Sequence, residues 1–156
     1  MTQPSKILIA GATGTVGREL AAQLSERGSA VRALVRDPES ANLPAGVEPV
    51  RGDLADPASL SAPLDGIDTM FLVWPFTSER AATELAPTVV EAITQRVHRV
   101  VYLSADAATD NPDRFWARLE RLIERSAGEF TFLRPTGFAK NTLMWASQIR
   151  EGDVVR

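Results

Sequence analysis

The feature that most constrains this chain is the stretch at residues 6–17, K-I-L-I-A-G-A-T-G-T-V-G, where a short apolar run meets three glycines. The run at 7–10 has no polar alternation, which predicts a strand covered on both faces in a parallel sheet. Gly11, Gly14 and Gly17 predict a sharp turn, a close backbone approach to a pyrophosphate and a helix packed tightly on the strand. The first turn of that helix presents unpaired N–H groups to an anion.

The glycine spacing is G-x-x-G-x-x-G, a variant of the general dinucleotide fingerprint G-x-G-x-x-G. Similar turns also occur in sheet proteins that hold no ligand. Because this one lies between an expected strand and an expected helix near the N-terminus, we interpret it as a nucleotide-binding turn.

The composition limits the classes of partner. The 156 residues are 44% hydrophobic and 24% charged, which predicts one globular domain over residues 1–156. A formal charge of -3 argues against nucleic acid or an anionic membrane as the main partner. The chain has no cysteine and one histidine, which excludes disulfides, thiolate nucleophiles and cysteine- or histidine-rich metal sites. No run reaches the roughly 18 apolar residues of a membrane span, so a cytoplasmic location is expected.

Apolar runs and helical periodicity alternate along the rest of the chain. Further strands are expected at 30–35, 47–51, 69–74, 99–104 and 130–133. Pro49 either argues against the second of these strands or puts it at a sheet edge. Helical patterns lie between the strands, at 17–28, 56–64, 78–93 with a kink or restart at Pro87, 112–123 and, after the last strand, 142–149. This alternation predicts an α/β fold, a doubly wound parallel sheet of the Rossmann type with strand order 3-2-1-4-5-6 and helices on both faces. Ligands are then expected at the carboxyl ends of the strands, between strands one and four.

Four stretches together resemble the NmrA-like family of atypical short-chain dehydrogenases, which are NAD(P)-binding proteins related to nucleotide-sugar epimerases and to a bacterial quinone oxidoreductase. They are G-A-T-G-T-V-G at 11–17, V-R-A-L-V-R-D-P at 31–38, V-V-Y-L-S-A at 100–105 and F-L-R-P-T-G-F-A-K-N at 132–141. The first stretch fits many dehydrogenases, but all four in order are more specific and span nearly the whole chain.

The resemblance implies a set of cofactor-binding residues. Thr13, Thr15 and Val16 would line the pyrophosphate beside the three glycines. Arg36 would meet the adenosine 2′-phosphate, and Asp53 and Leu54 would flank the adenine. Trp74 and Ser104 would approach the nicotinamide. The expected cofactor is NADP, with NAD left open.

Several of these residues have a second reading. Arg36 can hold a 2′-phosphate through two parallel hydrogen bonds, whereas its neighbour Asp37 suits the free ribose 2′-hydroxyl of NAD. Both are alternatively turn residues before Pro38. Asp53 either bonds the adenine edge or orders its own turn. Ser104 is a catalytic candidate, or a hydroxyl that merely ends a strand.

The chain departs from the family pattern in two respects. It ends soon after the expected sixth strand and so lacks most of the C-terminal part that forms the substrate pocket in the family. Short-chain dehydrogenases typically use a Tyr-x-x-x-Lys pair for proton transfer. Here the one tyrosine, Tyr102, lies inside an expected strand, and the only lysines are Lys6 and Lys140.

These observations favour an NADP(H)-dependent oxidoreductase that acts on a small carbonyl or quinone-type acceptor. The alternative is a catalytically inactive redox sensor that binds the dinucleotide and acts through a protein partner. A third reading, a truncated relic with neither activity, predicts apolar surface exposed to water. The substrate is not predicted, and self-association as a homo-oligomer through an uncovered sheet edge stays open.

Overall fold

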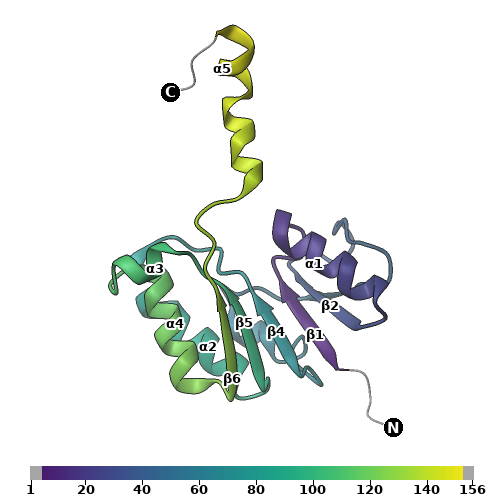
Figure 1. Cartoon of the computed structure of the whole chain (residues 1–156). Coiled ribbons are helices and arrows are strands. Elements are labelled where there is room, and N and C mark those ends of the chain that lie inside the picture. The colour runs from purple at the N-terminus through teal and green to yellow at the C-terminus, as the bar shows by residue number, and fades with distance from the viewer. Residues whose placement is uncertain (1–4, 153–156) are drawn as a thin grey trace.

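Six parallel strands form one sheet in the order β3-β2-β1-β4-β5-β6 in the computed structural model, which describes residues 5–152 (Figure 1). The strands are β1 (Lys6–Ala10), β2 (Ala30–Val35), β3 (Glu48–Arg51), β4 (Thr69–Leu72), β5 (Arg99–Leu103) and β6 (Glu129–Leu133). The chain runs outward from β1 to β3, returns to the centre at β4 and runs outward again to β6. The predicted fold class and strand order are therefore confirmed, as is the edge position of the strand that contains Pro49.

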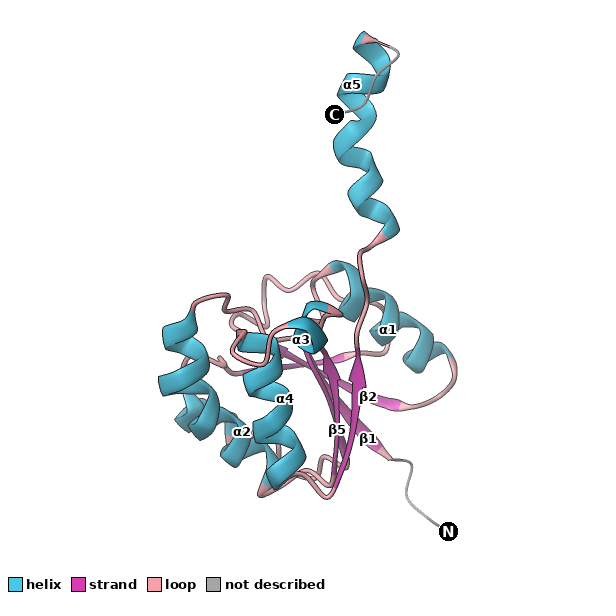
Figure 2. Ribbon diagram, turned by 60° about the vertical axis from the view of Figure 1, so that its left-hand side comes forward, coloured by secondary structure: helices cyan, strands magenta, loops and turns pink. Residues whose placement is uncertain are grey.

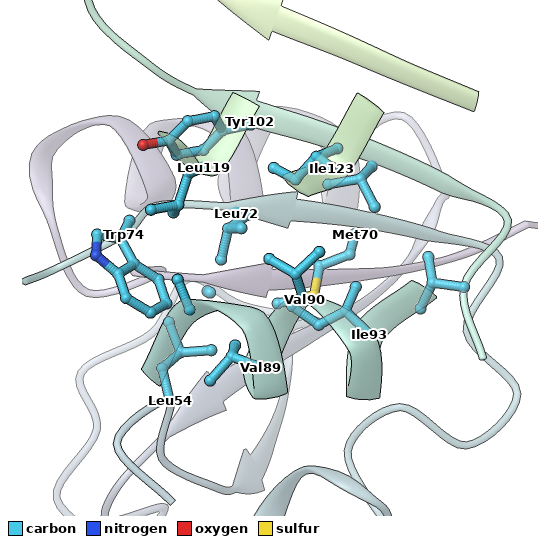
Figure 3. Close-up of a cluster of buried hydrophobic side chains, with 14 of the residues drawn as sticks. Leu54, Met70, Leu72, Trp74, Val89, Val90, Ile93, Tyr102, Leu119 and Ile123 are labelled. Carbon is cyan, nitrogen blue, oxygen red and sulfur yellow. The ribbon is translucent and has the colours of Figure 1, made fainter. Parts of the chain in front are cut away.

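Helices cover the two faces unequally, as Figure 2 shows. On one face α1 (Thr15–Glu26) packs on β1 and β2, and Ala21 meets Ile9 and Ala33 in a buried cluster. On the other face lie α2 (Ala86–Thr94) and α4 (Phe115–Ser126), with the short α3 (Ala107–Asp110) before α4. A larger core fills the space between this pair of helices and the sheet, and Figure 3 shows Leu72, Tyr102 and Leu119 within it.

Prolines explain two departures from ideal helices. The helix expected over 56–64 is a single 3₁₀ turn, Pro57–Leu60, capped as predicted by Asp56, whose Oδ1 accepts a hydrogen bond of 3.2 Å from the Ala58 N–H. Pro63 has no N–H to extend the helix. The expected restart at Pro87 is confirmed, because a π-helical turn at Ala81–Leu85 leads into α2 with the proline in its first turn. The short α3 was not predicted.

The last described segment leaves the sheet at its carboxyl edge. A 3₁₀ helix at Ala139–Trp145 continues into α5 (Ala146–Glu151), and together they project away from the domain (Figure 1). Its apolar side chains are exposed, with Leu143, Met144 and Ile149 each more than half accessible. A helix was predicted here, and the structure extends it at both ends. No helix within residues 5–152 combines the length and the apolar character needed to cross a bilayer. The expected cytoplasmic location stays a prediction.

Two glycines allow α1 to lie against the end of β1. Gly11 has φ +80°, a backbone conformation that side-chain-bearing residues rarely adopt. A Cβ at Gly17 would lie 2.2 Å from the carbonyl oxygen of Gly11. No rearrangement of a flexible side chain relieves such a contact, because both partners are backbone. The predicted turn at Gly11 and close helix packing at Gly17 are confirmed.

Replacing Gly17 with alanine is expected to push α1 away from β1. Overpacking of this kind costs about 2–3 kcal/mol, which lowers the melting temperature of a domain of this size by roughly 5–10 °C. Thermal unfolding followed by circular dichroism measures it. Gly152→Ala is the matched control, since a Cβ there meets nothing within 4 Å. Equal melting temperatures for the two variants would contradict the steric role of Gly17.

Candidate cofactor-binding site

Two cavities lie at the carboxyl ends of the strands, one on each side of the glycine turn. The larger, about 790 Å³, is bounded by the ends of β1 and β2 and by the loop that follows β3. The smaller, about 230 Å³, lies among the first turn of α1, the ends of β4 and β5 and the segment after β6. Both are lined by Gly11 and Val73. An elongated ligand with its middle at the turn would therefore place one end in each cavity.

The start of α1 provides an anion cradle between the cavities. The first-turn amides of Thr15, Val16 and Gly17 have no carbonyl four residues earlier within the helix. Gly14 precedes them without a side-chain cap, and the first turn has no acidic residue that would repel an anion. Thr15 and Val16 line the smaller cavity and Thr13 the larger. The predicted pyrophosphate residues are thus brought together, and their contact with a pyrophosphate stays a prediction.

Two arginines line the larger cavity. Arg36 directly follows β2, and its exposed guanidinium has no hydrogen-bond or ion-pair partner among residues 5–152. Arg18 comes from the first turns of α1 and donates hydrogen bonds to the backbone oxygen and the side chain of Asn42. Among the described residues, the guanidinium of Arg36 is therefore unpaired, whereas that of Arg18 is bound to the loop that contains Asn42.

The carboxylate of Asp37 also lines the larger cavity but is engaged by its neighbours. The Ser40 hydroxyl donates a hydrogen bond of 2.6 Å to Oδ2, and Nη2 of Arg51 lies 3.5 Å from Oδ1. The hydrogen bond from Ser40 is the main reason that the pKa of Asp37 lies below its ordinary value, and the charge of Arg51 acts in the same direction. Asp37 is therefore ionised at neutral pH with both oxygens approached by donors.

Asp53 and Leu54 both line the larger cavity, and their contact with an adenine stays a prediction. Asp53 orders its own turn, since Oδ1 accepts a hydrogen bond of 2.8 Å from the Ala55 N–H. Its Oδ2 has no hydrogen-bond partner in the described part of the chain. The two roles considered for Asp53 are compatible, with one oxygen in the turn and the other available to an adenine amino group.

Trp74 and Ser104 are placed differently from the other candidates. Both are buried, 7% and 4% exposed, and neither lines these two cavities. The side chains of Val73 and Leu103, one residue earlier in each case, line the smaller cavity instead, beside Phe138, Lys140 and Asn141. Successive side chains at a strand end point to opposite faces, which explains the difference. The approach of Trp74 and Ser104 to a nicotinamide stays a prediction.

Below the strand ends, three buried polar atoms have no hydrogen-bond partner in the described part of the chain: Nε1 of Trp74, Oη of Tyr102 and Oγ of Ser104. In Figure 3 the Trp74 nitrogen and the Tyr102 oxygen lie at the same end of the core. The carboxylate of Glu120 is close enough to influence Tyr102 and Ser104, although Ser104 makes no hydrogen bond to it within normal geometry. Burial, reinforced by the charge of Glu120, raises the pKa of Tyr102 far above its ordinary value. Tyr102 therefore keeps its proton at any physiological pH.

Comparison with known proteins identifies the family to which this chain belongs. A family described as NAD(P)H-binding matches residues 11–151, which include the glycine turn and every residue that lines the two cavities except Ala10. The chain belongs to this NAD(P)H-binding family. The match confirms this broader family, and placement in the narrower NmrA-like group stays a prediction.

Two relatives that match most of the chain are named as reductases. The chain is 39% identical to a (4-alkanoyl-5-oxo-2,5-dihydrofuran-3-yl)methyl phosphate reductase of Streptomyces griseus, over 96% of this chain and 54% of the relative. It is 35% identical to an NAD(P)H azoreductase of Xenophilus azovorans, over 93% and 52%. The chain thus spans about half the length of these relatives.

Solved structures share the fold. An NADPH-dependent quinone oxidoreductase from Escherichia coli, complexed with NADPH, superposes with a TM-score of 0.80 at 27% identity, over 93% of this chain and 54% of that one. The triphenylmethane reductase of Citrobacter sp. complexed with NADP(H) gives 0.82 at 22% identity, over 96% and 56%.

Sequence reasoning missed several residues that line the cavities: Arg18, Val73, Leu103, Phe138 and Lys140. Arg18 directly follows the last glycine of the turn, and a cation placed there is a signal that was available. The other four depend on which face each strand end presents and on the path of the chain after β6.

The single tyrosine gives a direct test of the buried polar cluster. Tyr102 is expected to show no tyrosinate absorbance at 295 nm near its ordinary pKa of 10.0 while the chain is folded. Because its folded pKa is raised, neutral Tyr102 contributes stability that is present below pH 10 and is lost as the pH rises above it. Alkaline titration, with circular dichroism as the control for folding, measures it. A tyrosinate step near pH 10 with native circular dichroism would contradict this burial, and guanidinium-unfolded chain gives the reference curve.

Proposed function

We propose that this chain binds NADPH across the two cavities and supports reduction of a small carbonyl or quinone-type acceptor. The observation that carries the proposal is the division of the site by the glycine turn. The larger cavity with its two arginines fits the adenosine 2′-phosphate half, and the smaller, mainly apolar cavity fits the nicotinamide half.

The charges of the larger cavity favour NADP over NAD. A 2′-phosphate accepts two parallel hydrogen bonds from a guanidinium, and that of Arg36 is unpaired. Asp37 would serve a free ribose hydroxyl, but its oxygens already accept from Ser40 and lie near Arg51. Arg18, held by Asn42, adds a second positive charge to the cavity.

The reaction class follows from the relatives and from the available proton donors. The reductases described above include proteins named for azo and quinone reduction. When bound, NADPH supplies a hydride, and the acceptor takes up a proton to complete its two-electron reduction. Tyr102 is fully buried and lines neither cavity, so it does not reach an acceptor bound there. An acceptor that draws its proton from water suits this chain, and a quinone does so.

The four sequence stretches support placement among NmrA-like proteins.

The alternative of an inactive redox sensor receives no support from the comparisons, since the most similar relatives reported above are named as reductases. Turnover distinguishes the two readings. Catalytic amounts of the protein are expected to accelerate loss of NADPH absorbance at 340 nm with a panel of soluble quinones and azo dyes. Stoichiometric NADPH binding without acceleration by any acceptor would overturn the oxidoreductase assignment for this chain and leave cofactor binding intact.

Reversing the charge at Arg36 tests the cofactor preference. Arg36→Glu is expected to weaken NADPH binding roughly 10- to 100-fold, the value of one or two charged hydrogen bonds, and to change NADH affinity only slightly. Calorimetric titration of both cofactors measures the split. Arg27→Glu makes the same charge change at the opposite end of α1 and lines neither cavity, so both affinities should persist there. Equal losses of NADPH and NADH in the Arg36 variant would remove this residue from the 2′-phosphate site.

A further inference from the structure

An ion pair between a buried glutamate and an exposed arginine joins α4 to the end of the sheet. Glu120 lies on the face of α4 that packs against the sheet and is 7% exposed. Arg134 is the first residue after β6. Its Nε lies 2.9 Å from Oε1 of Glu120, and its Nη2 lies 2.7 Å from Oε2. These two parallel hydrogen bonds fix both the distance and the orientation of the two groups.

The ionised carboxylate of Glu120 is destabilising in its buried position unless Arg134 is bound to it. Burial is the largest single influence on the pKa of Glu120 and would raise it, but the hydrogen bonds and charge of Arg134, together with the nearby Ser104 hydroxyl, outweigh burial and keep the pKa below its ordinary value. Glu120 is therefore ionised and depends on Arg134. Because the Arg134 side chain is 41% exposed, solvent screens the pair, and the net stability that such a pair contributes is small. A role in fixing geometry accounts for this pair better than a role in stability.

Two backbone hydrogen bonds hold the same short segment. The Ser104 N–H donates to the Leu133 oxygen at 2.8 Å, and the Asp106 N–H donates to the Pro135 oxygen at 3.1 Å. Together with the ion pair they attach residues 133–135 to the end of β5 and to α4. The chain after β6 therefore starts from a fixed position and direction.

The next residues form one wall of the smaller cavity. Phe138, Lys140 and Asn141 line it opposite Gly14, Thr15 and Val16. Every residue from 136 to 141 is exposed, so this wall has no core packing of its own. Its position depends on the attachment of residues 133–135.

We propose that Glu120, acting through Arg134, is a positioning residue that sets the affinity of the smaller cavity for the nicotinamide half of the dinucleotide. Glu120 lines neither cavity, and so it acts only by holding the wall in place. The proposal rests on the proposed function, because that function assigns the nicotinamide half to this cavity.

The test compares NADPH with 2′,5′-ADP, which carries the adenosine and 2′-phosphate but no nicotinamide. Glu120→Gln keeps the shape of the side chain and removes its charge. This variant is expected to bind NADPH about tenfold more weakly, as for loss of one charged hydrogen bond, and to bind 2′,5′-ADP like the wild type. Arg134→Lys keeps the charge without the fork and should lose part of the NADPH affinity.

Glu124→Gln is the matched control. Glu124 is exposed one turn further along α4, and it influences Arg134 only through its charge, with no hydrogen bond to it. Both ligands should bind this variant like the wild type. Unchanged NADPH affinity in Glu120→Gln, or equal losses of both ligands, would overturn the proposal, since a merely structural defect affects both.

Hydrogen exchange gives a readout that needs no ligand. Glu120→Gln is expected to speed exchange of the Ser104 and Asp106 amides, which donate to the segment, while amides in the middle of α1 keep their protection. Unchanged exchange at both amides would overturn the positioning role of Glu120, whether or not the wild type binds NADPH. Failure of the wild type to bind NADPH would overturn the proposed function instead. If Glu120→Gln does not fold, Arg134→Lys supplies the same comparisons.

Discussion

The contact between Gly17 and the carbonyl oxygen of Gly11 is the constraint on which the site depends. Any side chain at Gly17 would press into that oxygen, 2.2 Å from its Cβ, so only glycine lets α1 begin directly beside the end of β1. The first-turn amides then face the space above β1. Because β1 is a central strand flanked by β2 and β4, that space lies where the two halves of the sheet diverge. The two cavities are the consequence, one over each half.

Most of the fold could be predicted because its signals are local. Strands of a parallel sheet are covered on both faces and appear as continuous apolar runs, and the handedness of the crossovers then limits the order. Pro49 marked the edge strand for the reason that a missing N–H is tolerated there. The length of the helix expected over 56–64 was wrong because two local signals compete there. Asp56 and Pro57 correctly predicted where the helix begins, but Pro63 limits it to one 3₁₀ turn.

The site was predictable where backbone chemistry decides it and not where tertiary contacts do. The glycines, Thr13, Arg36 and Asp53 follow strand ends, and strand ends meet at one edge of the sheet. The choice between Val73 and Trp74, or between Leu103 and Ser104, depends on which face the last side chain takes, and the apolar runs do not encode it. Arg18 gains its position from Asn42, which is 24 residues away. The pair of Glu120 and Arg134 likewise requires knowing that α4 packs against the end of β6.

The two cavities are held by different kinds of structure. The larger one is built on strand ends and short turns, in which Asp37, Asp53 and Arg18 are already fixed by hydrogen bonds. The smaller one borrows a wall from an exposed segment that has no core packing. Such a segment adopts one position only if its first residues are attached strongly, because each free backbone residue costs about 1–2 kcal/mol to order. A buried carboxylate that depends on one arginine provides such an attachment, since any displacement of Arg134 leaves the charge of Glu120 unpaired. The cost of burying the charge is thus what makes the position of the wall definite.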